Sequence, residues 1–357
     1  MRIAVDIMGG DHAPAETVKG CIEAAARIKD LKGIDQIIMV GREPEIHAEL
    51  EKNKASLGEH LRIVHAAEVI EMGEAPAAAV RRKRDNSISR CMDLIKAGEA
   101  KAMVSAGNSG ALSAAALFRL GRIKGVERPA IACILPTRST RPMVLIDAGA
   151  NMDCEADWLV QFAIMGSAYS SAVLRESTHP RVGLLSIGTE DGKGNEVTKQ
   201  AFQRLQRCKA INFVGNVEGH DIFTGETDVI VCDGFVGNVV LKTTESVAHA
   251  IGFWMKEEFV RHPIRMLGAI LLKGALKAMK RRMDPEVYGG AVLLGVPGVC
   301  IVTHGASSHR AIFNAIRVGA AAIANDMSDV IATQIAANRL DVAAAAANPD
   351  KPAGVPA

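Results

Sequence analysis

Two adjacent side chains near the N-terminus, Asp11 and His12, could perform acid–base chemistry or bind an anion. They follow a β-branched run at 3–7 and the turn Gly9-Gly10, so they should lie where a strand ends. Histidine gains and loses a proton near neutral pH, so His12 could donate to a bound anion or protonate a leaving group. Alternatively, both residues only cap a helix that begins near Pro14.

A second segment, SIGTEDGKGNE at 186–196, is typical of an anion-binding turn. Glycine lets backbone amides approach a ligand closely, and hydroxyl and ammonium groups can donate to it. The relevant residues are Ser186, Gly188, Thr189, Gly192, Lys193 and Gly194. The segment lacks the P-loop spacing, and no G-x-G-x-x-G follows the first strand, which disfavours ATP hydrolysis and a Rossmann NAD enzyme. A flexible solvated loop remains the alternative.

Other β-branched runs also end in turns rich in Gly, Asn and Ser. Candidate binding side chains there are Asn108 and Ser109 in VSAGNSGAL, Asn216 in FVGNVEG, Asn238 in CDGFVGN, and His304, Ser307 and Ser308 in VTHGASS. A further turn of this type is IDAGANMD at 146–153. A single such turn is usually an ordinary helix cap. Several together predict a shared phosphate or anion cleft at the carboxyl ends of the strands.

The usual signatures of covalent and metal catalysis are missing from the sequence. Ser109 in GNSGA lacks the G-x-S-x-G spacing, and no H-E-x-x-H or C-x-x-C occurs. The seven cysteines are scattered and odd in number, which is typical of reduced core residues. We therefore expect neither a nucleophilic serine or cysteine nor a metal site, and no cofactor.

Alternation of short strands with helical stretches predicts an α/β fold with a mainly parallel sheet flanked by helices. The expected strands lie at 3–7, 36–40, 61–64, 102–105, 143–147, 182–187, 228–232 and 298–302, with helices including 17–28, 159–174 and 312–323. Hydrophobic residues make up 48% of the chain and aromatic residues 4%, which favours a close-packed core with small residues where helices meet the sheet. We assign residues 1–340 to this α/β body. Chain length alone does not distinguish one large domain from two closely packed lobes.

Residues 244–283 interrupt the alternation and predict an inserted helical hairpin, divided at His262-Pro263. Its second helix is amphipathic, with a basic stripe of Lys273, Lys277, Lys280 and Arg281 opposite a broad apolar face. A core or dimer-packing helix and a helix on a membrane surface both fit this pattern. The Ala/Pro-rich segment 341–357 is expected to be a disordered tail.

The charge balance limits the partners that the surface should attract. A net charge of +2 gives no general field for nucleic acid, and none is expected as a partner. The run Arg81, Arg82, Lys83 and Arg84 is a local candidate for docking an acidic protein, or only a solvated face. No apolar run approaches the roughly 18 residues of a membrane span, and the N-terminus lacks secretory-signal features. We expect a cytoplasmic protein.

The motifs as a set resemble the PlsX-type phosphate acyltransferases. The resemblance covers about residues 1–325 and rests on VDIMGGDHAP, SAGNSGAL, VLIDAGAN, LLSIGTEDGKGNE, NFVGNVEG, DVIVCDGFVGNVVLKT, YGGAVLLGV and THGASS. It implies a fold similar to phosphate acetyltransferases and isopropylmalate dehydrogenases. It also implies a homodimer that transfers a long-chain acyl group from acyl carrier protein to inorganic phosphate for phospholipid biosynthesis.

The same resemblance implies peripheral association with the cytoplasmic membrane through the hairpin, and possible contact with the downstream glycerol-3-phosphate acyltransferase. Alternatives are a phosphate acetyltransferase-like or decarboxylating dehydrogenase-like enzyme, or a non-catalytic scaffold that binds acyl carrier protein at the membrane. Phosphate is itself an anionic nucleophile, so acyl transfer to it needs binding and oxyanion stabilisation rather than a triad.

Roles for the candidate residues follow as hypotheses. The 188–194 turn with Lys193 holds phosphate; Asn108, Ser109 or Asn238 donates to the oxyanion; and His12, beside Asp11, assists the departing thiol. Catalytic roles are therefore expected for His12, Asp11, Lys193 and Asn238. Binding roles are expected for Gly9, Gly10, Asn108, Ser109, Ser186, Gly188, Thr189, Gly192, Gly194, Asn216 and His304.

Overall fold

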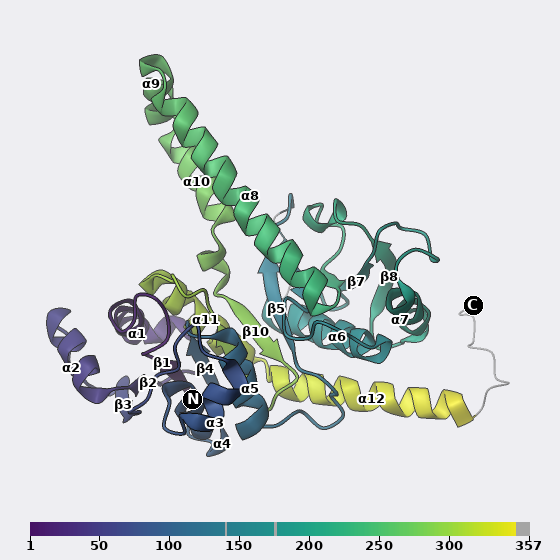
Figure 1. Ribbon diagram of the computed structural model, residues 1–357, viewed down its shortest axis with the longest axis horizontal. Helices are drawn as coiled ribbons and strands as arrows, with labels where there is room; N and C mark the ends of the chain where they lie inside the picture. The colour runs from purple at the N-terminus through teal and green to yellow at the C-terminus, as the bar shows by residue number, and fades with distance from the viewer. Residues whose placement is uncertain (140, 175–176, 348–357) are drawn as a thin grey trace.

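The computed structural model describes residues 1–139, 141–174 and 177–347, and its body is one large sheet with helices on both faces (Figure 1). The sheet has 11 strands in the order β3-β2-β1-β4-β11-β10-β5-β6-β9-β7-β8. The strands are β1 Arg2–Asp6, β2 Gln36–Gly41, β3 Leu61–His65, β4 Ala102–Ser105, β5 Ala130–Leu135, β6 Met143–Ile146, β7 Arg181–Leu185, β8 Asn212–Val217, β9 Val229–Val231, β10 Ala291–Leu294 and β11 Val299–Val302. The predicted α/β fold with a mainly parallel sheet is confirmed.

The edge strand β8 was not predicted, and neither were two strands in the middle of the sheet, β5 and β10. They pair antiparallel with each other, and they join the parallel set β3-β2-β1-β4-β11 to the parallel set β6-β9-β7-β8. Both are short apolar runs, and β5 is buried along its whole length. Such a run has no polar alternation, so periodicity cannot distinguish it from part of a buried helix.

Helices cover the two faces of this sheet. They are α1 Ala15–Ala26, α2 Glu43–Lys52, α3 Pro76–Arg82, α4 Ser87–Lys96, α5 Ser109–Arg119, α6 Ala156–Tyr169, α7 Glu196–Arg207, α11 His309–Ala324 and α12 Met327–Ala347. The larger core cluster packs α1, α6, α7, α11 and α12 on one face, and α4 and α5 pack on the other. Three of these helices, α4, α5 and α7, start at an asparagine whose side chain accepts a backbone N–H, as Asn86 does from Ser89.

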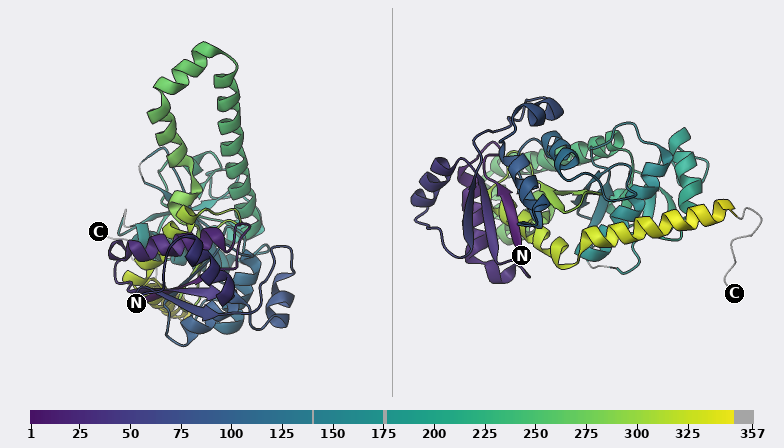
Figure 2. Two further views of the ribbon diagram at one scale, coloured as in Figure 1. Left: turned by 90° about the vertical axis from the view of Figure 1, so that its left-hand side faces the viewer. Right: turned by 90° about the horizontal axis from the view of Figure 1, so that it is seen from below.

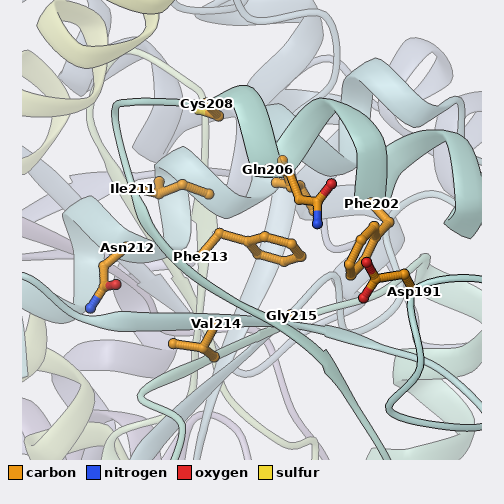
Figure 3. Close-up of a pocket in the computed structure, with 10 residues that line it drawn as sticks. Asp191, Phe202, Gln206, Cys208, Ile211, Asn212, Phe213, Val214 and Gly215 are labelled. Carbon is orange, nitrogen blue, oxygen red and sulfur yellow. The ribbon is translucent and has the colours of Figure 1, made fainter. Parts of the chain in front are cut away.

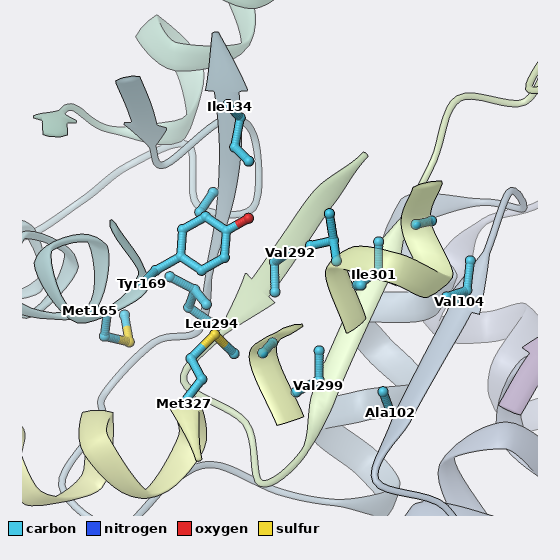
Figure 4. Close-up of a cluster of buried hydrophobic side chains, with 14 of the residues drawn as sticks. Ala102, Val104, Ile134, Met165, Tyr169, Val292, Leu294, Val299, Ile301 and Met327 are labelled. Carbon is cyan, nitrogen blue, oxygen red and sulfur yellow. The ribbon is translucent and has the colours of Figure 1, made fainter. Parts of the chain in front are cut away.

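The core is continuous across the middle of the sheet. Figure 4 shows Val292 and Leu294 of β10 beside Val299 and Ile301 of β11, with Tyr169 of α6 packed against them. Small residues allow the closest helix contacts, as the sequence composition predicts. A Cβ at Gly20 in α1 would lie 2.6 Å from the Cβ of Ile312 in α11.

A helical hairpin projects from the body (Figures 1 and 2). It consists of α8 Gly234–Val260, α9 Pro263–Leu271 at the far end and α10 Lys273–Met283, which returns to the 3-10 turn η4 Pro285–Tyr288. The break falls at the predicted place: His262 accepts the backbone N–H of Ile264 at 3.3 Å, and Pro263 begins α9. The first helix begins ten residues before 244, because its N-terminal turn packs against the end of β6.

The C-terminal segment differs in part from the expected disordered tail. Helix α12 continues through Ala347, so residues 341–347 are helical. Alanine has the highest intrinsic helix propensity, and this stretch is mostly alanine. The remaining predicted tail residues, 348–357, lie outside the described residues.

Two glycines in α8 provide a matched test of how this helix is seated. A Cβ at Gly237 would overlap the Asp147 carbonyl oxygen, whereas a Cβ at Gly252 would meet nothing within 4 Å. We expect Gly237→Ala to lower the free energy of unfolding by roughly 1–3 kcal/mol through overpacking. Gly252→Ala should instead stabilise the helix by roughly 0.5–1 kcal/mol. Urea unfolding of both variants measures this, and equal effects would contradict the close packing at Gly237.

Candidate active site

The strand directions divide the candidate residues into two groups of turns. Because β10 and β5 are both antiparallel to their neighbours, the β6-β9-β7-β8 set runs opposite to the β3-β2-β1-β4-β11 set. The turns after β1, β4 and β11 therefore leave one edge of the sheet, and the turns after β6, β7, β8 and β9 leave the other. Among the described residues, no hydrogen bond or ion pair joins a candidate in one group to a candidate in the other.

The first group joins the turns after β1, β4 and β11 through close backbone contacts. A Cβ at Gly9 would lie 2.7 Å from the Gly107 amide nitrogen, so only glycine fits there. Gly10 adopts φ +109°, which favours glycine, and the Asp11 amide donates to the Gly305 carbonyl at 2.8 Å. Gly9, Gly10 and Asp11 thus hold three turns together.

Beneath these turns lies a buried carboxylate that sequence reasoning did not single out. Asp6 ends β1 and accepts hydrogen bonds from the Ser105 hydroxyl at 2.6 Å and from the Met8 amide at 3.1 Å. Burial raises the pKa of the Asp6 carboxyl, and these hydrogen bonds offset only part of the effect. The sequence feature that could have identified Asp6 is an aspartate at the end of an apolar strand, shortly before a glycine turn.

Asn108 is placed in the first group, but its side chain is fully engaged. Its Oδ1 accepts the Ala111 amide at 3.0 Å and caps α5, while its Nδ2 donates to the Met72 and Glu74 carbonyls at 3.0 and 3.2 Å. The amide therefore fastens the segment before α3 to the start of α5. Ser109 is exposed at the first position of α5.

His12 and His304 are both exposed in this group. The His12 side chain makes no hydrogen bond among the residues described, so it is accessible to a ligand. The His304 ring accepts the Ala306 amide at 3.1 Å through Nδ1, which shapes its own turn. Nearby, the Thr303 hydroxyl is buried without a partner, a polar group that the sequence analysis did not mark.

Two carboxylates from distant segments cap the start of α11. Glu16 accepts the His309 amide at 2.6 Å and the His309 ring Nδ1 at 2.8 Å, and Glu286 accepts the Ser308 hydroxyl at 2.8 Å. Glu16 also belongs to the first turn of α1 and donates its own amide to the His12 carbonyl. The pair Glu16–His309 therefore ties the His12 turn to α11.

The second group is built around the turn that follows β7. Gly194 adopts φ +102° and is so close to its neighbours that a Cβ there would lie 3.0 Å from the Ser186 hydroxyl. Asn195 caps α7 by accepting the Thr198 amide at 2.9 Å, so this turn leads into a helix N-terminus. Thr189 and Gly192 are exposed, whereas Gly188 is buried.

Three polar groups of the second group keep hydrogen-bonding capacity that the described residues do not fully use. The Ser186 hydroxyl and the Asn216 Oδ1 are buried without a hydrogen-bond partner. Lys193 is half-exposed, and its ammonium lies 3.9 Å from Glu190, which is a loose ion pair. Positive groups at a helix N-terminus favour an anion.

Asn238 lies on the same edge, in the first turns of α8. It packs on Gly149, where a Cβ would lie 2.9 Å from its Nδ2, and its amide makes no hydrogen bond among the described parts of the chain. The Gly149 turn is held by the buried Asp147 carboxylate, which accepts the amides of Ile131, Gly149, Ala150 and Asn151. Burial raises the pKa of Asp147 despite these bonds.

The basic run at 81–84 is largely engaged within the chain. Arg82 and Lys83 both pair with Glu74, and Arg81 lies over the Phe118 ring at 4.9 Å. Arg84 is exposed. Two of the four cations therefore share one carboxylate, which neutralises one of their two charges and leaves the run with a net positive charge.

A shallow cavity of ≈ 480 Å³ lies between α7 and the edge strand β8 (Figure 3). Phe202 and Phe213 meet edge-on in it at 5.4 Å, and Asp191 of the 188–194 turn reaches its rim. The candidate residues Ser186, Lys193 and Asn216 do not line it. Within 1–139, 141–174 and 177–347, no cluster of three or more His, Cys, Asp or Glu side chains could hold a metal ion.

Comparison with known proteins identifies the family. A family model described as fatty acid synthesis protein matches residues 1–330. A phosphate acyltransferase of Pelotomaculum thermopropionicum is 50% identical over 335 residues, which are 94% of this chain and 95% of the relative. One from Nostoc punctiforme is 49% identical over 94% of this chain and 96% of the relative. The chain belongs to this family. It is therefore an acyltransferase.

Solved structures share the fold of this phosphate acyltransferase family member at low sequence identity. A phosphotransacetylase from Streptococcus pyogenes gives a TM-score of 0.61 at 20% identity, over 91% of this chain and 94% of that one. The EutD phosphotransacetylase from Staphylococcus aureus gives a TM-score of 0.56 at 15% identity, over 90% of this chain and 93% of that one. These likenesses show a common fold.

The Glu16–His309 contact makes a testable contribution to acid stability. Burial alone would raise the pKa of Glu16, but hydrogen bonds from His309 outweigh it and hold the pKa below the ordinary value of 4.5. A carboxyl group whose pKa is lowered by folding stabilises the folded state at pH values above its ordinary pKa of 4.5. This stabilisation is lost as the pH falls through the folded-state pKa. We expect Glu16→Gln to be less stable at pH 7 and to lose less stability on acidification. Thermal unfolding from pH 7 to below 4.5 measures this; parallel curves would contradict it.

Proposed function

We propose that this acyltransferase moves a long-chain fatty acyl group from acyl carrier protein to inorganic phosphate, giving acyl phosphate for phospholipid biosynthesis. The observation that carries the proposal is the turn after β7, where an unpartnered Ser186 hydroxyl and the half-exposed Lys193 lie at the N-terminus of α7. Such a site suits a small anion. The names of the relatives, phosphate acyltransferases, agree with phosphate as that anion.

The reaction needs few protein groups. A phosphate oxygen attacks the thioester carbonyl carbon, and the carbonyl electron pair moves to its oxygen. When the oxyanion collapses, the carbon–sulfur bond breaks and the thiolate leaves with that electron pair. Hydrogen phosphate gives up one proton overall and the thiolate gains one, so the products are acyl phosphate and a free thiol. The enzyme must position phosphate and stabilise the oxyanion.

Within this reaction the structure supports some role assignments better than others. Asn238 has a free amide on the same edge as Lys193, so we assign oxyanion stabilisation to Asn238. Asn108 is a weaker candidate, because its amide is already engaged. His12 is accessible and is assigned to protonation of the leaving thiolate, with Asp11 shaping its turn.

The hairpin suits attachment to a lipid surface. None of the residues of α9 is buried, and Ile264 and Leu271 are 74% and 79% exposed. The cations of the basic stripe, Lys273, Lys277, Lys280 and Arg281, form no ion pair among the described residues and could meet anionic headgroups. No described helix is both long and apolar enough to cross a membrane. We therefore propose peripheral binding at the cytoplasmic membrane, where product could pass to the downstream glycerol-3-phosphate acyltransferase.

We also propose that the chain acts as a homodimer. Helix α8 carries large exposed apolar side chains along its length, from Phe235 at its base, 62% exposed, to Phe253 and Trp254 in its last turns, at 65% and 60% exposure. Exposed apolar surface of this kind marks an interaction site. Sedimentation as a single copy at micromolar concentration would contradict a dimer.

The reaction itself is tested by mixing the protein with a long-chain acyl carrier protein, with and without phosphate. We expect free thiol and acyl phosphate together, and only when phosphate is present, as measured by mass spectrometry. Acetyl-CoA in place of the acyl carrier protein provides the comparison. Faster turnover of acetyl-CoA, or an intact thioester in both mixtures, would refute the proposal.

The same assay separates the roles of Lys193 and His12. Lys193→Ala should raise the KM for phosphate roughly 10- to 100-fold, because a charge-assisted contact is lost. His12→Ala should lower kcat at saturating phosphate by roughly 100-fold or more, as expected for a general acid. Lys209→Ala, at the other end of α7, is the charge-matched control and should change neither. A His12→Ala enzyme with native kcat would remove that role.

Membrane attachment is tested at the tip of the hairpin. Leu271→Glu should weaken binding to vesicles of anionic phospholipid by roughly tenfold or more, because an exposed apolar anchor becomes a carboxylate. Leu57→Glu is the matched control, since Leu57 is 42% exposed on the body of the protein. Vesicle co-sedimentation measures both variants, and equal binding by them would argue against the hairpin as the anchor.

A further inference from the structure

Asn216 is buried beneath the turn after β7, and the orientation of its amide is determined. It is 7% exposed on β8, and its Nδ2 donates to the Glu190 carbonyl at 2.9 Å. A carbonyl oxygen can only accept, so the end of the amide that faces Glu190 must be the NH₂ group. The other end, Oδ1, is a buried hydrogen-bond acceptor with no partner.

The free acceptor lies on the same face of the sheet as the Ser186 hydroxyl. In the parallel pair β7–β8, Leu184 is in register with Asn216. Ser186 directly follows β7, and its amide donates to the Val217 carbonyl at 2.8 Å, which continues the pairing with β8. Side chains two residues apart along extended chain share a face, so Ser186 is on the same side as Leu184 and Asn216. The turn that contains Glu190 and Gly194 covers this face, and Lys193 belongs to it. A hydroxyl donor and an amide acceptor therefore lie on one face, beneath the turn that carries Lys193.

An acceptor in an anion site has a specific chemical consequence. A fully deprotonated oxyanion such as sulfate offers only lone pairs, which repel an amide oxygen. Hydrogen phosphate keeps one proton near neutral pH and can donate it. A buried acceptor left without its donor is costly, so a site of this kind rejects the ligand that lacks the proton.

We propose that Asn216 is a specificity-determining residue whose Oδ1 accepts the P–OH proton of hydrogen phosphate, so that the enzyme selects phosphate over sulfate. This inference rests on the proposed function, in which the 188–194 turn holds the acceptor substrate. The Ser186 hydroxyl and Lys193 attract any tetrahedral anion, whereas Asn216 distinguishes the protonated one.

The test compares the KM for phosphate with the inhibition constant of sulfate in the acyl-transfer assay. In the native enzyme we expect sulfate to compete at least 100-fold more weakly than phosphate binds. Asn216→Leu has a similar volume without an acceptor, and it should raise the KM for phosphate about 10- to 100-fold. The inhibition constant of sulfate for this variant should stay within twofold of the native value or fall. The preference for phosphate over sulfate should therefore be lost.

A second variant separates the acceptor from the contact with Glu190. Asn216→Asp keeps an acceptor but loses the NH₂ group, so binding of both anions should weaken while selectivity for phosphate persists. Asn212→Leu, at the exposed start of the same strand, is the matched control and should leave both constants unchanged. A purely structural role of Asn216 would raise the phosphate and sulfate constants in equal proportion in Asn216→Leu. That result would overturn the inference, whereas native protein without phosphate-dependent turnover would instead refute the proposed function.

Discussion

The pairing of β10 with β5 in the middle of the sheet is the constraint on which the rest of this structure depends. These strands join two parallel sets that run in opposite directions, and their side chains are part of one continuous core. Each set alone would be an ordinary parallel sheet with its ligand edge at the carboxyl ends. Joined through β10 and β5, they present two such edges.

Opposite strand directions do not by themselves keep the two edges apart in space. Adjacent strands twist by roughly 20–25°, and the six steps from β4 to β7 add roughly 120–150°. Two sets that run antiparallel are thereby turned toward a common side. The proposed roles of His12 on one edge and Lys193 on the other in one reaction require this twist, because no described contact joins their turns.

Each edge uses the same local device. A buried aspartate stands at the end of a strand, Asp6 as the last residue of β1 and Asp147 directly after β6, and its carboxylate accepts N–H groups from the glycine turn that follows. A buried carboxylate is costly unless it is hydrogen-bonded, so each turn is fixed in the conformation that supplies the donors. Beside the turn after β7, on the second edge, the Ser186 hydroxyl and the Asn216 oxygen are buried without a partner. In the proposed site, a bound anion would complete the hydrogen bonding of those atoms.

The sequence by itself determined the α/β class, most of the strands, the break at His262-Pro263 and the turns that carry the candidate residues. These features depend on local chemistry: β-branched runs, glycine turns, asparagine caps and proline at a helix start. The tertiary structure decided which turns meet, because that depends on the apolar strands β5 and β10, whose pattern has no period to recognise. It also decided which polar atoms are already engaged. Asn108 and Asn216 look alike in sequence, yet packing occupies the whole amide of one and leaves the oxygen of the other free.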